Sequence, residues 1–368
     1  MKLKKMMPHF EAIAPLELAE DWDNVGLLTG DPEQSIKKVM LAIDLTQAVF
    51  EEAKAQKVDL MLTYHPPVFE PVKKVVAGQG VSPLLYEAIR AKMAIYTMHT
   101  ALDCVRGGVN DLLAEIVGIE KSQPLQAQGF DEKKMCKMVV FLPESDVASV
   151  SQAIFDAGAG HIGKYSRCSF RCEGTGTFQG EAGTNPTVGV ANVFEQAAEF
   201  RLETIVPVEY LSAVVAAMIK VHSYEEVAYD VIPLLHGQTE TGLGRVGDLG
   251  KPVSKKILIE HIRKTFKQKV VGIIGPTTGK VTRAAVCAGS CGSMLNQVIG
   301  QKCDFYLTGE LKHHFALELQ EAGVTTVCLS HTNSERIILP ELAKRCRSKC
   351  DGVKFVVSRK DRDPFEWC

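Results

Sequence analysis

A regular alternation of short apolar runs with longer amphipathic stretches limits the folds open to this chain more than any other feature. The first third of the sequence contains three apolar runs, at residues 38–44, 59–64 and 94–99. Stretches of helical periodicity follow them, at residues 47–57, 83–93 and 107–118. Apolar strands joined by helices of this length are typical of a mostly parallel sheet that is buried on both faces. The expected fold class is therefore α/β, with helices on both faces of the sheet.

This alternation stops in the middle of the chain. A polar stretch with Gly and Pro begins near residue 120 and has the composition of a linker. Beyond it we expect a strand at 135–143, a helix at 144–160, polar strand segments at 165–180 and 199–207, a helix at 209–223 and a strand at 227–235. This β-α-β-β-α-β order is typical of the split βαβ, or ferredoxin-like, arrangement. The middle of the chain is therefore predicted to be a separate α+β domain.

Strands and helices alternate again in the last third. The expected helices lie at residues 254–267, 293–302, 312–323 and 334–349. The expected strands lie at residues 283–289, 304–310, 325–330 and 353–358. We therefore predict one α/β domain whose halves are residues 1–127 and 237–368, interrupted by an inserted domain at residues 128–236.

Composition and charge exclude several classes of protein. The chain has 368 residues, of which 46% are hydrophobic and 23% charged, an ordinary mixture for a globular protein. The net charge of -2 gives no electrostatic reason to expect nucleic acid or an anionic membrane as a partner. No apolar run approaches the roughly 20 residues of a transmembrane helix. We therefore expect a cytoplasmic protein.

The cysteine pattern favours reduced thiols. The 11 cysteines are odd in number, scattered, and not preceded by a secretory signal. This is the pattern of a reducing compartment and not of a disulfide framework. Cys168 with Cys172 and Cys287 with Cys291 stand at C-x-x-x-C spacing. Because a zinc site needs four ligands at closer paired spacing, we interpret both pairs as structural.

Polar side chains follow several of the predicted strands. In open α/β sheets, ligands bind outside the carboxyl ends of the strands. The polar residues at these ends are His65, His99, Thr100, Asp103, Ser290, Cys291, Thr308, Glu310, His331, Asn333 and Glu335. Imidazole and carboxylate groups from at least three separate strands are therefore expected to meet at one rim of the domain.

The spacing within this group indicates a metal site. His331 and Glu335 stand at i and i+4, which on a helix places both side chains on one face, about 5–6 Å apart at Cβ. Asp103 adds a carboxylate able to bridge two ions, and His65 adds a second imidazole. Two His, one Asp and one Glu suit Zn²⁺, Mn²⁺ or Fe²⁺ better than Ca²⁺.

Each motif taken alone also fits a simpler interpretation. A single His after a strand is commonly a surface or capping residue, and a His/Glu pair at i and i+4 is commonly a solvated pair. Asn333 and Ser334 are residue types that begin helices. The glycine-containing segment "CAGSCGS" at 287–293 fits a phosphate-binding turn and a plain tight turn equally well.

Six segments together resemble a known family. They are "DWDNVGLLTGD", "YHPPVF", "MHTALDCVRGGVND", "VCAGSCGS", "YLTGELKHHFALELQEAGV" and "SHTNSERIILP". They are similar to the NIF-three-like proteins, often called GTP cyclohydrolase 1 type 2 homologues. The resemblance implies a two-metal site in an α/β domain and a ring-shaped homohexamer, a trimer of dimers. It also implies that residues 128–236 are the inserted PII-like or CutA-like domain of the longer members.

The resemblance also implies roles for individual residues. His65, Asp103, His331 and Glu335 match the metal ligands of the family motifs. His314 matches the histidine of a Thr-Gly-Asp-x-x-x-His motif, in which this chain has Glu310 in place of the aspartate.

Tyr64 is a departure from the family pattern. It stands where the family commonly has the first histidine of a His-His-Pro motif. A tyrosine, with a pKa of about 10, is a poor metal ligand unless the ion draws off its proton. Occupancy of one of the two metal positions is therefore an open question.

Two functional hypotheses follow. The first is a metal-dependent hydrolase acting on a phosphate-containing or nucleotide-like substrate, in which paired metals generate the nucleophile. Here His99 and His314 are candidates for orientation or proton transfer, and the 287–293 turn for holding a small phosphate-bearing ligand. The alternative is a non-catalytic, metal-binding regulatory or scaffold protein whose inserted domain gates a central cavity. A catalytic metal keeps an open coordination position and a structural one does not, so this property distinguishes the two.

Overall fold

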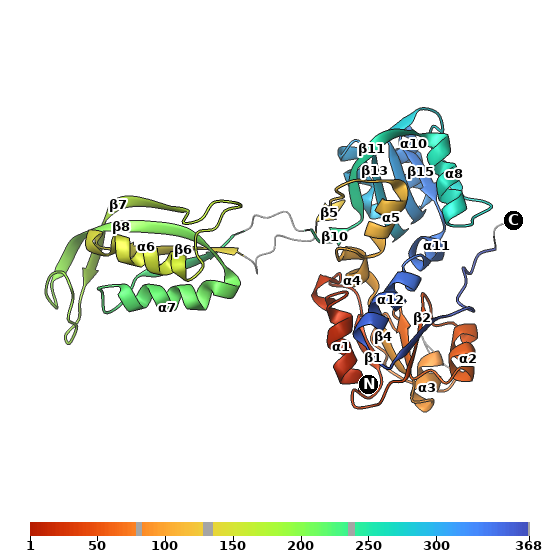
Figure 1. Cartoon of the computed structure of the whole chain (residues 1–368), viewed down its shortest axis with the longest axis horizontal. Helices are drawn as coiled ribbons and strands as arrows, with labels where there is room; N and C mark the ends of the chain where they lie inside the picture. Colours follow the sequence, from red (N-terminus) through yellow and green to blue (C-terminus); the bar gives the residue numbers. More distant parts are fainter. Residues whose placement is uncertain (79–82, 128–134, 235–239, 367–368) are drawn as a thin grey trace. The chain divides into compact units, whose positions relative to one another are not determined.

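A computed structural model describes residues 1–78, 83–127, 135–234 and 240–366 of this chain. The chain divides into two compact units. The first unit comprises Met1–Gln128 and Thr239–Cys368, and the second comprises Gly129–Gln238. Within the described ranges, the first unit contains two five-stranded sheets and one two-stranded sheet, and the second contains one four-stranded sheet (Figure 1).

The first sheet of the larger unit is mostly parallel. Its strands, in spatial order, are β1 (Gly26–Thr29), β4 (Ala94–Thr97), β3 (Leu60–Thr63), β2 (Lys38–Ala42) and β16 (Lys354–Val357). Only β1 runs antiparallel to its neighbour among these described strands. Alternate strand residues face opposite layers of helix: one layer holds α2 (Gln47–Ala55) and α3 (Pro83–Arg90), the other α1 (Leu3–Glu11) and α12 (Leu339–Lys349).

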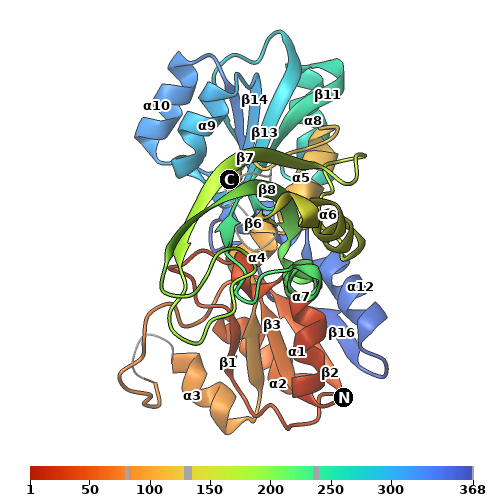
Figure 2. The ribbon, with the colours of Figure 1, turned by 90° about the vertical axis from the view of Figure 1, so that its left-hand side faces the viewer.

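The second sheet of this unit mixes parallel and antiparallel pairs. Its order is β11 (Arg245–Ser254), β13 (Lys280–Ser290), β14 (Phe305–Glu310), β15 (Thr325–Cys328) and β12 (Gly272–Ile274). The three central strands are parallel, whereas β11 and β12 are antiparallel edge strands. Figure 2 shows α9 (Leu295–Gly300) and α10 (His313–Glu321) on one side, and α5 (Val109–Val117) and α8 (Lys255–Thr265) on the other. The α5–α8 side belongs to the same hydrophobic core as the α1–α12 side of the first sheet.

The smaller unit has its own core. Its elements follow in the order β6 (Met135–Leu142), α6 (Val147–Asp156), β7 (Ser169–Gln179), β8 (Phe194–Pro207), α7 (Leu211–Val221) and β9 (Tyr229–Pro233). The strands form an antiparallel sheet in the order β7-β8-β6-β9. Apolar residues of β6, β8, α6 and α7 pack into one cluster. This is the element order expected from the sequence, and the last residue of the strand predicted at 227–235 lies outside the described residues.

The predicted single, mostly parallel sheet is not what the larger unit shows. The antiparallel edge strands β1, β11 and β12 were not predicted from the sequence. Their segments carry glycines, and β11 carries a proline as well. Because Gly and Pro weaken strand patterns and are tolerated mainly at edges, such strands give little sequence signal. The predicted helix at 334–349 is also divided, into α11 (His331–Arg336) and α12, with Pro340 in the first turn of α12.

Candidate metal centre

Two pairs of neighbouring parallel strands end in polar side chains. Asp44 follows β2 and His65 follows β3, and β2 pairs with β3. Glu310 ends β14, and His331 begins α11 just after the adjacent β15. Because parallel strands bring their carboxyl ends to one edge, each pair consists of a carboxylate beside an imidazole. Figure 1 shows α11 and α4 (His99–Cys104) between the two sheets.

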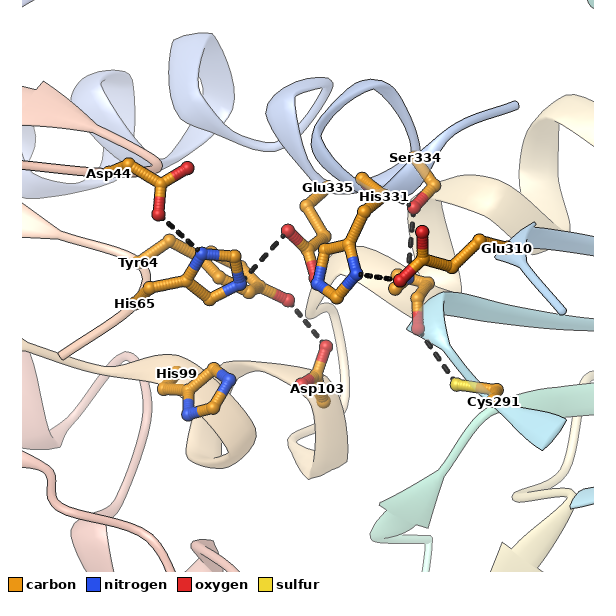
Figure 3. A network of polar contacts seen from close by, with 12 residues as sticks. Asp44, Tyr64, His65, His99, Asp103, Cys291, Glu310, His331, Ser334 and Glu335 are labelled. Atoms are coloured by element: carbon orange, nitrogen blue, oxygen red, sulfur yellow. Dashed lines mark hydrogen bonds and ion pairs between the residues drawn. The ribbon is translucent and has the colours of Figure 1, made fainter. Parts of the chain in front are cut away.

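Glu335 joins the two imidazoles. Glu335 lies one turn of α11 after His331, and its carboxylate lies between the imidazole rings of His65 and His331 (Figure 3). Its Oε1 is 3.1 Å from His331 Nε2, and its Oε2 is 3.2 Å from His65 Nε2. The ligand atoms of these three residues all lie within 4.8 Å of one another. The structure therefore brings together three of the four residues predicted as metal ligands, in a group able to hold one ion.

The other ring nitrogens are occupied. His65 Nδ1 is 2.9 Å from Asp44 Oδ1, and His331 Nδ1 is 2.9 Å from Glu310 Oε1. A carboxylate on Nδ1 fixes the orientation of an imidazole and makes Nε2 the ligating atom, as in many metal sites. Both Nε2 atoms consequently face the Glu335 carboxylate.

The charges of this group are strongly coupled. Burial alone would lower the pKa of His65, but its contacts with Asp44 and Glu335 outweigh burial and raise the pKa to about 10. The contact with Glu335 is the main reason that the pKa of His331 is raised to about 9. Burial would raise the pKa of Glu335, but the two imidazoles outweigh it and hold the pKa below its usual value. In the metal-free chain the two imidazoles are therefore cationic at neutral pH and neutralise the buried carboxylate.

One oxygen of Glu335 is left without a hydrogen bond. Glu335 is only 3% exposed. Within the described part of the chain, the contact of Oε2 with His65 is an ion pair and Oε2 receives no hydrogen bond. Because a buried carboxylate oxygen normally accepts hydrogen bonds, this atom is suited to binding a cation.

Asp103 lies beside the triad but is held by Tyr64. The Tyr64 hydroxyl donates a hydrogen bond to Asp103 Oδ1. Burial, together with the charge of Glu335, raises the pKa of Asp103 to about 7. Burial, with the nearby carboxylates, raises the pKa of Tyr64 well above its usual value. Tyr64 thus stays protonated and acts as a hydrogen-bond donor in this arrangement.

His99 is a neighbour of the triad, whereas His314 is not brought to it. The His99 ring centroid is 5.1 Å from that of His65, and His99 Nδ1 is 2.7 Å from Asp23 Oδ1. His99 has a positive φ of 27°, an uncommon backbone conformation that often occurs at functional sites. His314 is exposed on α10, where it packs against Phe315.

The group opens into a cavity of about 700 Å³. Its lining includes the triad together with Glu20, Trp22, Asp44, Phe69, His99, Asp103, Gly289 and Cys291, but not His314. Asp44 was not predicted as a site residue, because it is the last residue of the apolar run expected at 38–44. Asp23 and Trp22, which lie in an irregular segment with no strand before it, were not predicted either.

The segment at 287–293 is the irregular end of β13, where the strand register shifts between Cys287 and Ser290, followed by a short 3-10 helix that begins at Gly292. The backbone N–H of Ala288 donates to Asn110 Oδ1, and that of Gly289 donates to Ser334 Oγ, both at 2.9 Å. A Cβ on Gly289 would lie 2.7 Å from Glu335 Oε1, so only glycine fits beside the carboxylate. These two amides are occupied within the protein and do not face a phosphate.

Cys287 and Cys291 are joined by a disulfide bond, which corrects the expectation of reduced thiols at this pair. The irregular end of β13 brings their Cα atoms to 6.1 Å, within the range that a disulfide spans. The other described cysteines are free, as expected. No helix within the described ranges is long and apolar enough to cross a bilayer.

Comparisons with known proteins cover nearly the whole chain. A family model described as Duf34/NIF3 (NGG1p interacting factor 3) matches residues 1–364. A Bacillus subtilis (strain 168) protein named "GTP cyclohydrolase 1 type 2 homolog" is 35% identical over 360 residues, 97% of this chain and 96% of the relative. The crystal structure of a Bacillus cereus protein related to NIF3 has a TM-score of 0.72 and 33% identity, covering 100% of this chain and 99% of that one. A Staphylococcus aureus crystal structure has a TM-score of 0.77 at 24% identity, with the same coverage, and supports the fold alone.

Proposed function

Because the chain belongs to the Duf34/NIF3 family, we propose that it is a metal-dependent hydrolase that holds a divalent transition metal between His65, His331 and Glu335. The observation that carries this proposal is the shared carboxylate, which presents one oxygen to each imidazole at 3.2 and 3.1 Å. Asp44 and Glu310 occupy both Nδ1 atoms, so both Nε2 atoms face one region. This is the arrangement that a single ion requires.

The donor set fits a transition metal. Two imidazoles and a carboxylate suit Zn²⁺, Fe²⁺ or Mn²⁺ better than Ca²⁺, which prefers oxygen ligands. Three protein ligands leave a coordination position open, as in catalytic sites, and the cavity beside them can admit a substrate. We further propose that a second ion binds beside Asp103. The Tyr64 hydroxyl, which donates a hydrogen bond to Asp103, competes with that ion for the carboxylate.

The surrounding residues have distinct roles in this proposal. A bound divalent ion lowers the pKa of a coordinated water molecule towards neutrality and polarises the attacked group. Asp44 and Glu310 keep the imidazoles oriented. His99, held at Nδ1 by Asp23, takes up or delivers a proton through Nε2. The substrate is phosphate-containing or nucleotide-like, and the geometry gives His314 no part in its conversion.

Metal content and activity together test this function. Purified protein is loaded with Zn²⁺, Mn²⁺ or anaerobic Fe²⁺, and bound metal is measured by mass spectrometry. We expect at least one tightly bound ion per chain, and at least tenfold weaker binding in Glu335→Gln and His331→Ala. His314→Ala is the matched control, because it removes an exposed histidine outside the cavity and should leave the metal content unchanged.

The loaded protein is then assayed for hydrolysis of phosphoesters and nucleotide-like compounds. Loss of turnover in the two ligand variants, with folding intact by circular dichroism, supports the proposal. Tight metal binding without turnover of any substrate favours the regulatory or scaffold alternative. A wild-type chain that binds no metal contradicts both.

We further propose that the chain forms a homohexamer in the cytoplasm. Residues 129–238 then act as a PII-like regulatory module. Light scattering of the purified protein should then give six times the chain mass of 40.2 kDa. A monomer at micromolar concentration would contradict this part alone and leave the metal site untouched.

A further inference from the structure

Two large aromatic side chains are exposed at the wall of the metal cavity. Trp22 is 60% exposed and Phe69 is 46% exposed, and both line the cavity. Their rings are nearly parallel, at 12°, with centroids 5.9 Å apart. Paired exposed aromatics beside a cavity leave a large apolar surface in water, which is the usual character of a ligand-binding surface.

The aromatic pair is fixed to His99, which lies beside the metal centre. Asp23, next to Trp22, has a fully buried side chain that binds His99 Nδ1 and the backbone N–H of Thr100. Asn24 Nδ2 donates to the Val68 carbonyl at 2.6 Å, which joins the segment of Trp22 to that of Phe69. The His99 ring meets both aromatic rings edge-on, at 5.9 Å and 5.6 Å. The stacking surface is therefore held at a set position relative to the triad.

The charge of the cavity limits what can bind there. Four carboxylates line it, those of Glu20, Asp44, Asp103 and Glu335. None of the described lining residues is Lys or Arg. A polyphosphate would meet no lysine or arginine in this lining and would be repelled by its carboxylates, whereas a ring that carries N–H donors would meet several acceptors.

We propose that the ligand of this cavity carries an uncharged, amino-substituted planar heterocycle, which stacks on Trp22 and Phe69 and offers its N–H groups to the acidic lining. The polyphosphate form of such a compound is disfavoured. This inference rests on the proposed function, because it names the substrate class of the same site. It differs from the cyclohydrolase action on GTP that the relatives' name suggests, since GTP carries a triphosphate.

Tryptophan fluorescence tests this inference directly. The chain has two tryptophans, and Trp367 lies outside the described residues. In a Trp367→Phe background, the emission of Trp22 is titrated with adenosine, guanosine, their 5′-triphosphates and inorganic phosphate. Each titration is done with metal-loaded and with chelator-treated protein. We expect saturable quenching by at least one nucleoside, with its triphosphate binding at least tenfold more weakly.

Variants of the stacking pair sharpen the test. Phe69→Leu should weaken nucleoside binding about tenfold, because stacking of one base on an aromatic side chain contributes on that scale. Phe170→Leu is the matched control, because it removes an exposed Phe from the other unit. Tighter binding of the triphosphates than of the nucleosides, or no quenching by either nucleoside, would overturn the inference. Failure of the proposed metal site would be seen separately, in the metal analysis. In that case the protein would bind no metal, while the chelator-treated protein would still bind the nucleoside.

Discussion

His65 and His331 carry raised pKa values of about 10 and 9 in the metal-free chain. Both imidazoles are then protonated at neutral pH, and a metal ion must displace these protons from Nε2. We predict that metal binding at pH 7 releases close to two protons and that the apparent affinity rises as pH increases towards 9–10. Calorimetry in two buffers of different ionisation enthalpy measures the protons released.

The metal-free protein should show the opposite trend in stability. Folding raises the pKa of both histidines above 6.5. Their contribution to the free energy of unfolding is therefore complete below that pH and is lost as the pH rises through 9 to 10. A metal affinity that does not change between pH 6 and 8, without proton release, would contradict this account of the triad.

Tyr64 provides a second test at the scale of a single residue. Its hydroxyl donates to Asp103, so that carboxylate is occupied in the structure. We predict that Tyr64→His raises the metal content per chain, because it adds an imidazole and releases the Asp103 carboxylate. Tyr64→Phe is the control, since it frees Asp103 without adding a ligand. An unchanged metal content in Tyr64→His would show that Tyr64 is not what limits a second ion.

The side chains of the candidate metal group could be found from the sequence, but their mutual arrangement could not. His65, His331 and Glu335 were selected because they follow apolar runs or share a helical spacing, and the structure places them together. The contact of His331 with Glu310 spans 21 residues, and only the pairing of β14 with β15 reveals it. His314 shows the limit of motif matching, because the motif did not indicate that its side chain is exposed.

At the scale of elements, a buried arginine connects the helices around the site. Arg245 of β11 is fully buried and donates to Asp111 of α5 and to the backbone carbonyls of Cys104 and Val105 at the end of α4. We predict that Arg245→Leu lowers the free energy of unfolding by about 3–5 kcal/mol, because it leaves buried acceptors without a donor. Denaturant unfolding measures this change.

Arg106 is the matched control for this substitution. It also pairs with Asp111, at 3.2 Å, but its side chain is 47% exposed. Arg106→Leu should therefore cost only about 0–1 kcal/mol. Equal effects of the two substitutions would mean that the buried arginine does not hold α4 and α5 together.

Parallel strands, the edge strand β16 included, were better predicted than antiparallel edge strands. The strands β2, β3, β4, β13, β14 and β15 lie inside the predicted apolar runs or overlap them closely, because strands buried on both faces have continuous apolar sequence. The strands β1, β11 and β12 need only one neighbour and carry little apolar signal. The helix α1 was missed because Pro8 lies inside it.

At the scale of the whole molecule, the segment before the smaller unit pairs with the segment after it. Ala127 of β5 (Gln126–Ala127) lies opposite Gly242 of β10 (Gly242–Leu243) in an antiparallel pair. We predict that an Asn-Gly turn can replace residues 128–241, because a two-residue turn closes such a pair. The shortened protein should fold and keep the wild-type metal stoichiometry, measured by circular dichroism and metal analysis.

A version with a longer Gly-Ser linker serves as the control for turn strain. If both shortened proteins fold but bind no metal, the centre depends on the removed residues, and the assignment of the site to the larger unit alone is wrong.

The number of sheets was not predictable from the strand pattern. Parallel strands from both halves of the chain have the same apolar character, so the sequence indicated one sheet. The described residues of the larger unit form two five-stranded sheets, and residues that follow strands of both converge on Glu335. Which strands pair is set by long-range packing, which periodicity does not record.

Anomalous X-ray diffraction at the absorption edge of the loaded metal tests the central claim most directly. We predict a peak about 2.0–2.2 Å from His65 Nε2, His331 Nε2 and a Glu335 oxygen. The claim of a metal centre would be contradicted if a crystal grown at saturating metal showed these three side chains together but no anomalous peak between them. A peak only elsewhere in the molecule would contradict the claim as well.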